Sequence, residues 1–421
     1  MLDAVFDGLT YLRSQGAPGL FSLFWFVILF ELPRYMFSFL AAAIVCRPVK
    51  PFDLDRERVG KVSAVIAGHN EAAAVERCVH CLLEQSEPPD EIVVVSDGST
   101  DRMTDKLADL LRAGLIQKAH ATELRAGKAA AVNLGETLAS GDILVNVDCD
   151  CTFDRHALKH IVRPFYDREV GAVCGNILVR NPEAGLFCEF QAIEYLITIS
   201  LGKRAQDIIG QVSCASGAFS AFRMSALRDV GGLDAGGGED LDLTLRLRNA
   251  DWGIVFSGDA ICYTDAPETL TALIRQRFRW ERDAVRIRYR KHLEVINPFS
   301  SRFKVGELFH EFEFLLFNVL AAAALPIYLL WLFDFYGAMA PLILLGAQAG
   351  LFIMDIMVFA IAAYATPQQR SEVMVPYLLG YSLFYGNFMR LVRLVAYVQE
   401  WVLKASYSDP YVPEKVHRVR E

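Results

Sequence analysis

The chain has 421 residues, of which 53% are hydrophobic and 22% are charged, and its formal net charge is −8. This length suits one large domain with additional elements, or two to three domains. The negative balance argues against a nucleic-acid surface, so no nucleic-acid partner is expected. The apolar residues gather in N-terminal and C-terminal blocks, whereas residues 51–300 have the mixed composition of a soluble domain.

The N-terminal segment, residues 1–50, contains an apolar block at 20–46 that is long enough to cross a bilayer. Glu31 and Arg34 are three residues apart and can pair on one helix face, and Pro33 predicts a kink. A cleaved signal peptide is the alternative interpretation. The block is too long and begins too late for one, so a transmembrane helix is predicted.

Residues 51–300 alternate between strand and helix patterns. Apolar runs predict strands at 62–67, 91–97 and 141–148, and amphipathic runs predict helices at 71–84, from Asp101 onward and at 128–139. This alternation is typical of a mainly parallel sheet, so the predicted fold class is α/β with a Rossmann-like domain.

Polar clusters follow each of the three predicted strands: Gly68-His69-Asn70-Glu71, Asp97-Gly98-Ser99-Thr100 and Asp148-Cys149-Asp150. Each cluster alone also fits a turn or a helix N-cap. Ligands bind at the carboxyl ends of parallel strands. Three clusters at successive strand ends therefore predict one shared binding site.

Asp148 and Asp150 flank a single residue, so in an extended segment their side chains point to the same side. Two carboxylates there suit Mg²⁺ or Mn²⁺, with substrate phosphates completing the coordination shell. The alternative is a solvated acidic pair in a loop. The apolar strand that precedes the pair favours a pocket, so we predict that Asp148 and Asp150 bind a metal that stabilises a diphosphate leaving group.

Two further segments open predicted helices. Lys128 begins the helix at 128–139 and is either a phosphate contact at the helix N-terminus or an exposed surface lysine. Glu239 and Asp240 follow glycines 236–238. They are either first-turn acids favoured by the helix dipole, or they include a base that removes the proton of an acceptor hydroxyl.

Residues 276–280 form a basic, aromatic stretch just before the C-terminal apolar blocks. Trp280 could stack on a sugar ring while Arg279 neutralises phosphate. The same residues also fit an amphipathic helix at a membrane interface, and both interpretations can hold together.

The C-terminal region, residues 301–400, contains apolar blocks at 314–333, 339–364 and 374–398. The first two predict membrane spans. The third carries Arg390 and Arg393, which are costly in lipid. It therefore either spans with these arginines facing protein or lies at the interface.

Basic residues cluster after the first apolar block, which places residues 51–300 in the cytosol and the N-terminus outside. Four full spans would leave the tail, 401–421, outside as well, although its basic residues favour the cytosol. The topology of 374–398 and of the tail stays open.

The nine cysteines are interpreted as reduced cytosolic thiols. Cys78 and Cys81 lack a second pair of ligands, so no zinc site is predicted.

Taken together, the ordered motifs resemble those of processive family 2 glycosyltransferases, which include cellulose, chitin, hyaluronan and poly-N-acetylglucosamine synthases. The motifs that carry the resemblance are Asn70-Glu71, Asp97-Gly98-Ser99, Asp148-x-Asp150, Glu239-Asp240 and Gln276-x-x-Arg279-Trp280. It covers about residues 60–290. The stretches 216–227 and 267–280 are most similar to the bacterial poly-N-acetylglucosamine synthase branch, with chitin-oligosaccharide synthases close behind.

The resemblance implies a GT-A fold and an inverting single displacement. It implies Asp240 as the general base, Asp150 with Asp148 at the metal, and a UDP-sugar donor and a growing polysaccharide as partners. The binding residues that it implies are Glu71, Asp97, Lys128, Asp148, Glu239, Gln276, Arg279 and Trp280. Ala67-Gly-His-Asn-Glu71 departs from the common Pro-x-Tyr-Asn-Glu, and Gly238 replaces a frequent threonine.

The predicted function is therefore a multi-pass enzyme of the bacterial inner membrane that polymerises UDP-N-acetylglucosamine or UDP-glucose. The lipid bilayer and a small membrane or periplasmic accessory subunit are its further expected partners. One alternative is a non-processive transferase that adds a single sugar to a lipid carrier. Another is a transporter or scaffold with a degenerate ligand-binding domain, against which the retained carboxylates argue.

Overall fold

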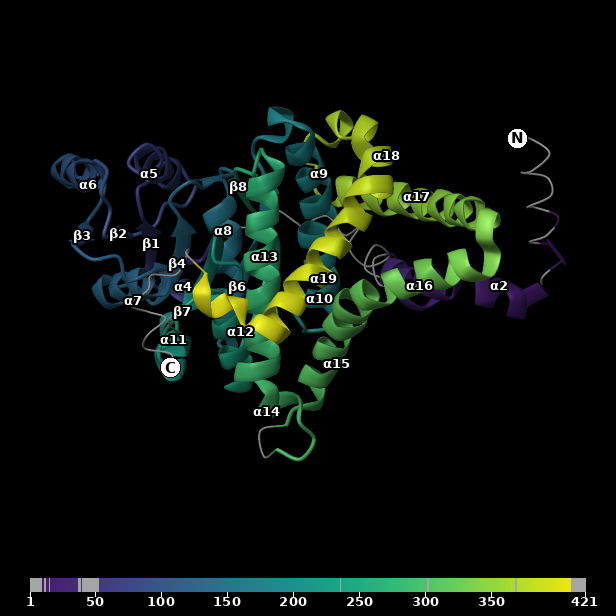
Figure 1. Cartoon of the computed structure of the whole chain (residues 1–421). Coiled ribbons are helices and arrows are strands. Elements are labelled where there is room, and N and C mark those ends of the chain that lie inside the picture. The colour runs from purple at the N-terminus through teal and green to yellow at the C-terminus, as the bar shows by residue number, and fades with distance from the viewer. Residues whose placement is uncertain are drawn as a thin grey trace.

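The computed structural model describes residues 16–36, 53–234, 236–300, 303–367 and 369–409, together with residues 10, 13, 14 and 39. Residues 53–300 form a sheet domain, and residues 16–36 and 303–409 form a helical part beside it (Figure 1). The remaining residues of the predicted N-terminal block and the tail after 409 lie outside the described residues.

The described residues of the sheet domain contain one mixed sheet with the strand order β3-β2-β1-β4-β7-β6-β8-β5. The strands are β1 (Val62–Gly68), β2 (Glu91–Asp97), β3 (Lys118–Thr122), β4 (Ile143–Asp148), β5 (Thr152–Phe153), β6 (Val170–Val179), β7 (Phe219–Arg223) and β8 (Gly253–Thr264). Neighbours β1–β2, β1–β4, β2–β3 and β6–β8 are parallel, whereas β7 runs antiparallel between β4 and β6 and β5 is antiparallel to β8. The predicted α/β class with a mainly parallel sheet is confirmed.

The register of the parallel strands brings the predicted polar clusters to one edge. Gly68 of β1 pairs with Ser96 of β2, and Ala67 pairs with Asp148 of β4. The three strands therefore end at the same level, and the residues that follow them share one side of the sheet.

Helices cover both faces of the sheet (Figure 1). Those that pack with the strands are α5 (Val75–Leu83), α6 (Met103–Arg112) and α8 (Ala157–Val162) on one face, and α7 (Lys128–Leu138), α11 (Met224–Val230) and α12 (Glu239–Asn249) on the other. A short helix, α4 (Arg56–Val59), precedes β1. The helix predicted at 128–139 is confirmed. The helix predicted at 71–84 begins only at Val75, because residues 72–74 form a turn after Asn70, whose φ is 59°.

Longer helical runs connect the sheet domain to the helical part. One consists of α9 (Leu186–Tyr195), the π-helical segment η4 (Leu196–Leu201) and α10 (Gly202–Ile208). The other consists of α13 (Leu270–Arg286), the π-helical segment η5 (Ile287–Lys291) and α14 (Leu293–Ile296). Short 3₁₀ turns lie at η2 (Arg163–Tyr166) and η3 (Pro182–Ala184).

The helical part is built from long apolar helices. They are α2 (Gly16–Phe26) with the π-helical η1 (Val27–Glu31), α15 (Val305–Phe314) with η6 (Leu315–Leu320) and α16 (Ala321–Tyr336), and α17 (Ala340–Ala365) after the turn η7 (Gly337–Met339). The turns η8 (Ser371–Val373) and η9 (Val375–Tyr377) lead to α18 (Leu378–Gly380), η10 (Tyr381–Tyr385), α19 (Gly386–Leu403) and the turn η11 (Ala405–Ser408).

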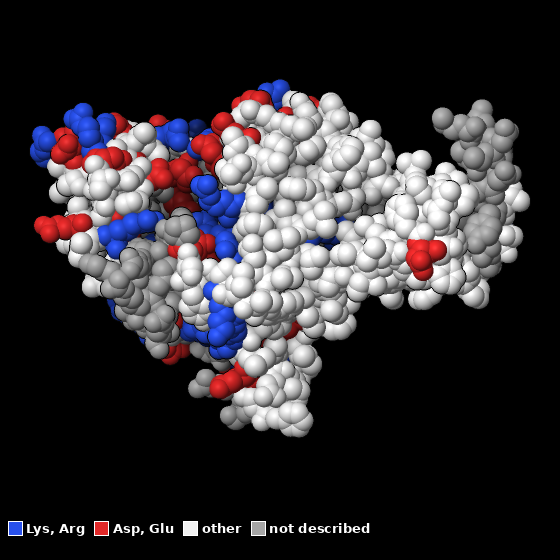
Figure 2. Space-filling model, viewed as in Figure 1, with Lys and Arg blue, Asp and Glu red and all other residues white. Residues whose placement is uncertain are grey.

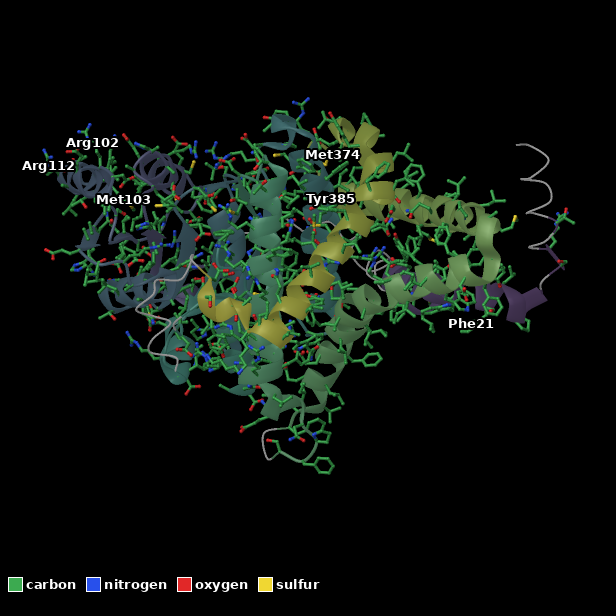
Figure 3. All side chains as sticks on the ribbon, viewed as in Figure 1. Phe21, Arg102, Met103, Arg112, Met374 and Tyr385 are labelled. Atoms are coloured by element: carbon green, nitrogen blue, oxygen red, sulfur yellow. The ribbon has the colours of Figure 1, made fainter. Side chains whose placement is uncertain are left out.

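Two helical stretches of the described residues, Gly16–Met36 and Val305–Ala365, are long and apolar enough to cross a membrane, with mean hydropathy of 1.5 and 2.1. The surface of this half is almost free of charge in Figure 2. Phe21, labelled at its outer end in Figure 3, is 49% exposed. The first helix has a π-helical turn just before Pro33 and non-helical backbone angles at Phe24, and the kink at Pro33 stays a prediction.

The block predicted at 374–398 does not meet the same test of length and composition. Its two arginines face protein. Arg390 pairs with Glu31 of the first helix, and Arg393 donates to Glu281 of α13 at 3.1 Å. The predicted pair of Glu31 and Arg34 is also present, at 3.4 Å.

Candidate active site

A cavity of about 290 Å³ opens at the carboxyl ends of β1, β2 and β4. Its lining residues are Ala67, Gly68, His69, Glu71, Asp97, Arg125, Gly127, Lys128, Ala131, Asp148, Cys149 and Asp150. Acidic and basic side chains lie next to one another at the hollow between the sheet domain and the uncharged half (Figure 2). The prediction that the three polar clusters share one pocket is confirmed by this lining.

Lys128 reaches across the cavity to Asp148, with which it forms an ion pair. Its Nζ also donates to the carbonyl oxygen of Gly217 at 3.1 Å. Partial burial raises the pKa of Asp148, and the charge of Lys128 opposes that rise. Lys128 is therefore not a bare surface lysine, and its ammonium group lies where it can meet an anionic ligand.

The peptide groups of Gly217 join three parts of the site. Its N–H donates to Asp240 Oδ2 at 3.1 Å, and its carbonyl accepts from Asn146 Nδ2 at 2.7 Å as well as from Lys128. Asp240 stands in the first turn of α12, after Gly238, whose φ is 66°. A single loop residue thus brings Asp240 close to Lys128 and Asp148, although Asp240 does not line the cavity itself.

Asp150 is held from the far strands of the sheet. Arg180, which follows β6, donates to its backbone carbonyl at 2.8 Å, and Thr264 at the end of β8 donates to Oδ2 at 3.3 Å. Burial raises the pKa of Glu71, and the nearby carboxylates of Asp150 and Asp148 raise it further. Glu71 therefore lies near the acidic pair, and its predicted contact with uridine stays a prediction.

The acidic pair is compatible with a divalent cation that is completed by substrate. Among the residues that the structure describes, no three His, Cys, Asp or Glu side chains converge to hold an ion by themselves. Mg²⁺ is commonly bound through one or two carboxylates together with substrate phosphates and water. The donor set of Asp148 and Asp150 at the cavity wall fits that kind of site.

Asp97 holds the loop that leads to Lys128. Its Oδ1 accepts from Ala126 N and its Oδ2 from Gly127 N, both at 2.7 Å. Asn70 similarly accepts from the N–H groups of Thr100 and Asp101, at 2.7 and 3.3 Å. Both polar side chains therefore fix loops at the pocket rim, and Asp97 is itself part of the cavity lining.

Glu239 opens α12 next to Asp240. Burial raises its pKa to about 7, the neighbouring Asp240 contributes in the same direction, and Lys128 opposes the shift. The ordinary value is 4.5. The folded protein thus binds this proton more tightly than the unfolded chain does.

Replacing Glu239 by glutamine is expected to change the pH dependence of stability. A raised carboxyl pKa favours the folded state while the group is protonated, and that advantage is lost as the pH rises from 4.5 toward about 7. The melting temperature of the variant minus that of the wild type should therefore increase from about pH 5 to about pH 8. Thermal scans of both proteins at the two pH values measure this increase. If the melting temperatures of variant and wild type differed by the same amount at both pH values, the raised pKa of Glu239 would be contradicted.

Gln276, Arg279 and Trp280 lie on α13, outside the lining of the cavity. Trp280 is 40% exposed, and the guanidinium of Arg277 lies 4.6 Å from its ring centroid. The side-chain oxygen of Gln276 is buried and has no hydrogen-bond partner among the described residues. The 276–280 motif therefore presents the exposed aromatic ring of Trp280 and the buried side-chain oxygen of Gln276, which can still accept a hydrogen bond.

Tyr195, at the end of α9, lies near Arg277 of α13 and is close enough to Asp150 to feel its charge. The guanidinium of Arg277 lies 5.8 Å from the centroid of the Tyr195 ring. Burial raises the pKa of the Tyr195 hydroxyl, and the charge of Asp150 acts in the same direction. Tyr195, Arg180 and Thr264 were not predicted from the sequence, and Gly217 was noticed only as part of the stretch 216–227. Asn146 could have been noticed, because it is a polar residue inside an apolar strand that ends at the site.

Three comparisons with known proteins agree with this geometry. Residues 63–231 match the family model described as Glycosyl transferase family 2. The chain is 31% identical over 228 residues to a poly-beta-1,6-N-acetyl-D-glucosamine synthase of Staphylococcus epidermidis, covering 54% of this chain and 55% of the relative. It is also 31% identical over 230 residues to the synthase of Staphylococcus aureus strain COL, again covering 54% and 55%.

The chain thus spans about half the length of these curated relatives. Among solved structures, it is similar to the mannosyltransferase PcManGT of Pyrobaculum calidifontis in complex with GDP-Man and Mn²⁺. That match has a TM-score of 0.55 and 19% identity, and covers 91% of this chain and 99% of the other. At this identity the likeness concerns the fold. The predicted GT-A fold is confirmed. Over residues 63–231 the chain is similar to family 2 glycosyltransferases, as the motifs predicted.

Proposed function

We propose that this protein is a membrane-embedded, processive, inverting glycosyltransferase that polymerises a UDP-activated sugar into a β-linked polysaccharide. The observation that carries the proposal is the meeting of Lys128, Asp148 and Asp240 around the Gly217 peptide, inside a domain that is similar to polysaccharide synthases. The names of these relatives favour UDP-N-acetylglucosamine over UDP-glucose as the donor.

The donor nucleotide would occupy the cavity at the strand ends. Asp97 holds the loop in front of Lys128, so the ammonium of Lys128 is available to the diphosphate once it leaves Asp148. Asp150, with Asp148, would hold Mg²⁺ or Mn²⁺, which when bound supplies positive charge to the departing diphosphate. Glu71 and Glu239 are assigned to the same donor site.

Asp240 would act on the acceptor. Its carboxylate takes the proton of the attacking hydroxyl as the new glycosidic C–O bond forms and the bond from the anomeric carbon to the UDP oxygen breaks. The products are the extended chain and UDP, with inversion at the anomeric carbon. The hydrogen bond from Gly217 N holds the carboxylate in place for this role.

Gln276, Arg279 and Trp280 would line the acceptor end. An exposed indole suits the apolar face of a sugar ring, and the unpaired oxygen of Gln276 can accept from a sugar hydroxyl. Because α13 packs along α19, which in turn contacts α16, the acceptor end would lie near the helices that are apolar enough to cross the membrane.

The apolar helices support a location in the bacterial inner membrane, with the catalytic domain on the cytosolic side and the product exported as it is made. The lipid bilayer and a small accessory subunit in the membrane or periplasm are the proposed partners in this step. The surface of α16 and α17 is almost free of charge, and this is the feature that suits contact with lipid (Figure 2).

The test is incubation of membranes containing the protein with a panel of labelled UDP-sugars and Mg²⁺ or Mn²⁺. We expect incorporation from UDP-N-acetylglucosamine into a polymer that a hydrolase specific for one β-linkage degrades. Sizing the product separates a polymerase from an enzyme that adds one sugar to a lipid carrier. Absence of transfer from every UDP-sugar would overturn the proposal.

A further inference from the structure

A buried carboxylate, Glu194, lies where α9 of the sheet domain meets the helical part. Its Oε2 accepts from Arg277 Nη2 of α13 and from the Tyr385 hydroxyl of η10, each at 2.6 Å. All three residues are less than 9% exposed. Figure 3 shows Tyr385 at this junction. Glu194 therefore connects three helices that are far apart in the sequence.

One of its two partners supports the exposed aromatic ring of the proposed acceptor end. The guanidinium of Arg277 lies 4.6 Å from the centroid of Trp280 and 5.8 Å from that of Tyr195. A cation facing an aromatic ring attracts it through the ring quadrupole. Since the Arg277 charge is buried, its place is set by the carboxylate that neutralises it, and the position of Trp280 depends on Glu194 in turn.

The other partner leads into the helical part. Tyr385 ends a π-helical segment, a type of helical irregularity that is frequent at functional sites. Glu194 and Tyr385 also line a polar cavity of about 50 Å³ between the helices, whose other lining includes Glu31, Asp355, Arg390 and Arg393. Glu194 thus lines this polar cavity and also binds the arginine that lies beside Trp280.

We propose that Glu194 is a positioning residue for the acceptor chain. Its carboxylate holds Arg277 beneath Trp280, and its bond to Tyr385 fixes this arrangement to the helix that continues as α19. The inference rests on the proposed function. It extends that function, because binding of the growing chain would then depend on a residue outside the cavity at the strand ends.

The test compares full-length variants in lipid nanodiscs. Glu194→Gln removes the charge that neutralises Arg277, and Tyr385→Phe removes only the hydroxyl. Glu189→Gln is the matched control, because Glu189 lies on the same helix and is 5% exposed, and none of its described hydrogen bonds involves Arg277. The readouts are product length, the KM for the donor, the rate of UDP release and the melting temperature.

We expect Glu194→Gln to shorten the product roughly fivefold, and Tyr385→Phe to shorten it less, while the donor KM stays within about twofold of wild type. The control should make chains of wild-type length. In a Trp280→Ala background, Glu194→Gln should cause no further shortening, because the ring that it positions is gone. A merely structural role would predict the same loss in both backgrounds.

Two outcomes would overturn the inference while leaving the proposed function intact. One is a Glu194→Gln variant whose product length equals that of the Glu189→Gln control, and the other is equal shortening with and without Trp280. A wild-type protein that makes no polymer would instead overturn the proposed function, and the inference with it. Should Glu194→Gln fail to fold, Tyr385→Phe carries the same comparison, with Tyr381→Phe as its control.

Discussion

Replacing Asp240 by asparagine is expected to lower the rate of sugar transfer by about 10²- to 10⁴-fold, the range that general acid–base catalysis contributes. An asparagine oxygen can still accept from Gly217 N, so the loop should keep its place. What is lost is the ability to take a proton. Single-turnover transfer from UDP-N-acetylglucosamine, measured with donor binding, tests this, because donor affinity should be nearly unchanged.

Asp242 provides the matched control, since it lies on the same helix and undergoes the same change of carboxylate to amide. It is 3% exposed and forms ion pairs with Arg246 at 2.8 Å and Lys291 at 2.7 Å, and it accepts from His292. Asp242→Asn should therefore lower the melting temperature and leave the activity per folded molecule close to wild type. If Asp240→Asn kept full activity, another group would have to be the base.

Asp150→Asn is expected to lower transfer by about 10²- to 10³-fold, because this carboxylate would hold the cation that stabilises the charge of the departing diphosphate in the transition state. A chelator should abolish activity, and added Mg²⁺ or Mn²⁺ should restore it. Titration of Mn²⁺ followed by electron paramagnetic resonance in the presence of UDP should show weaker binding in the variant, because a carboxylate ligand has been removed.

Asp154→Asn is the control for this second change. Asp154 lies four residues further along the chain, and its carboxylate accepts from the N–H of His156 rather than facing the cavity. Its variant should bind Mn²⁺ and transfer sugar as the wild type does. Full activity of the wild type in excess chelator would contradict the metal site.

The sequence predicted the parts of this site that follow apolar strands of the parallel half. Asp97, Asp148 and Glu71 could be brought together from sequence because parallel strands end at one edge, so position along the chain translates into position in space. Lys128 was found as the first residue of a helix, and its contact with Asp148 required only that this helix return to the same edge.

The site contacts that the sequence did not predict depend on the part of the sheet that contains the antiparallel strand β7. Strand β7 runs antiparallel to β4, and this pairing, not its local pattern, brings Gly217 beside Asn146 and Lys128. Strand β3 was missed because its residues are half-exposed and give a weak apolar signal. Glu194 and Arg277 are 83 residues apart, and nothing in either local sequence indicates the other.

The ion pair of Glu31 and Arg390 has a consequence for how the chain is made. The two residues are separated by 359 positions, and the carboxylate of Glu31 is buried. At ribosomal rates of about 5 to 20 residues per second, Arg390 is synthesised roughly 20 to 70 seconds after Glu31. Of the two arginines that pair with Glu31 in the folded chain, only Arg34 is present during that interval, so the pairing of this buried acid is completed only when the last helix has been made.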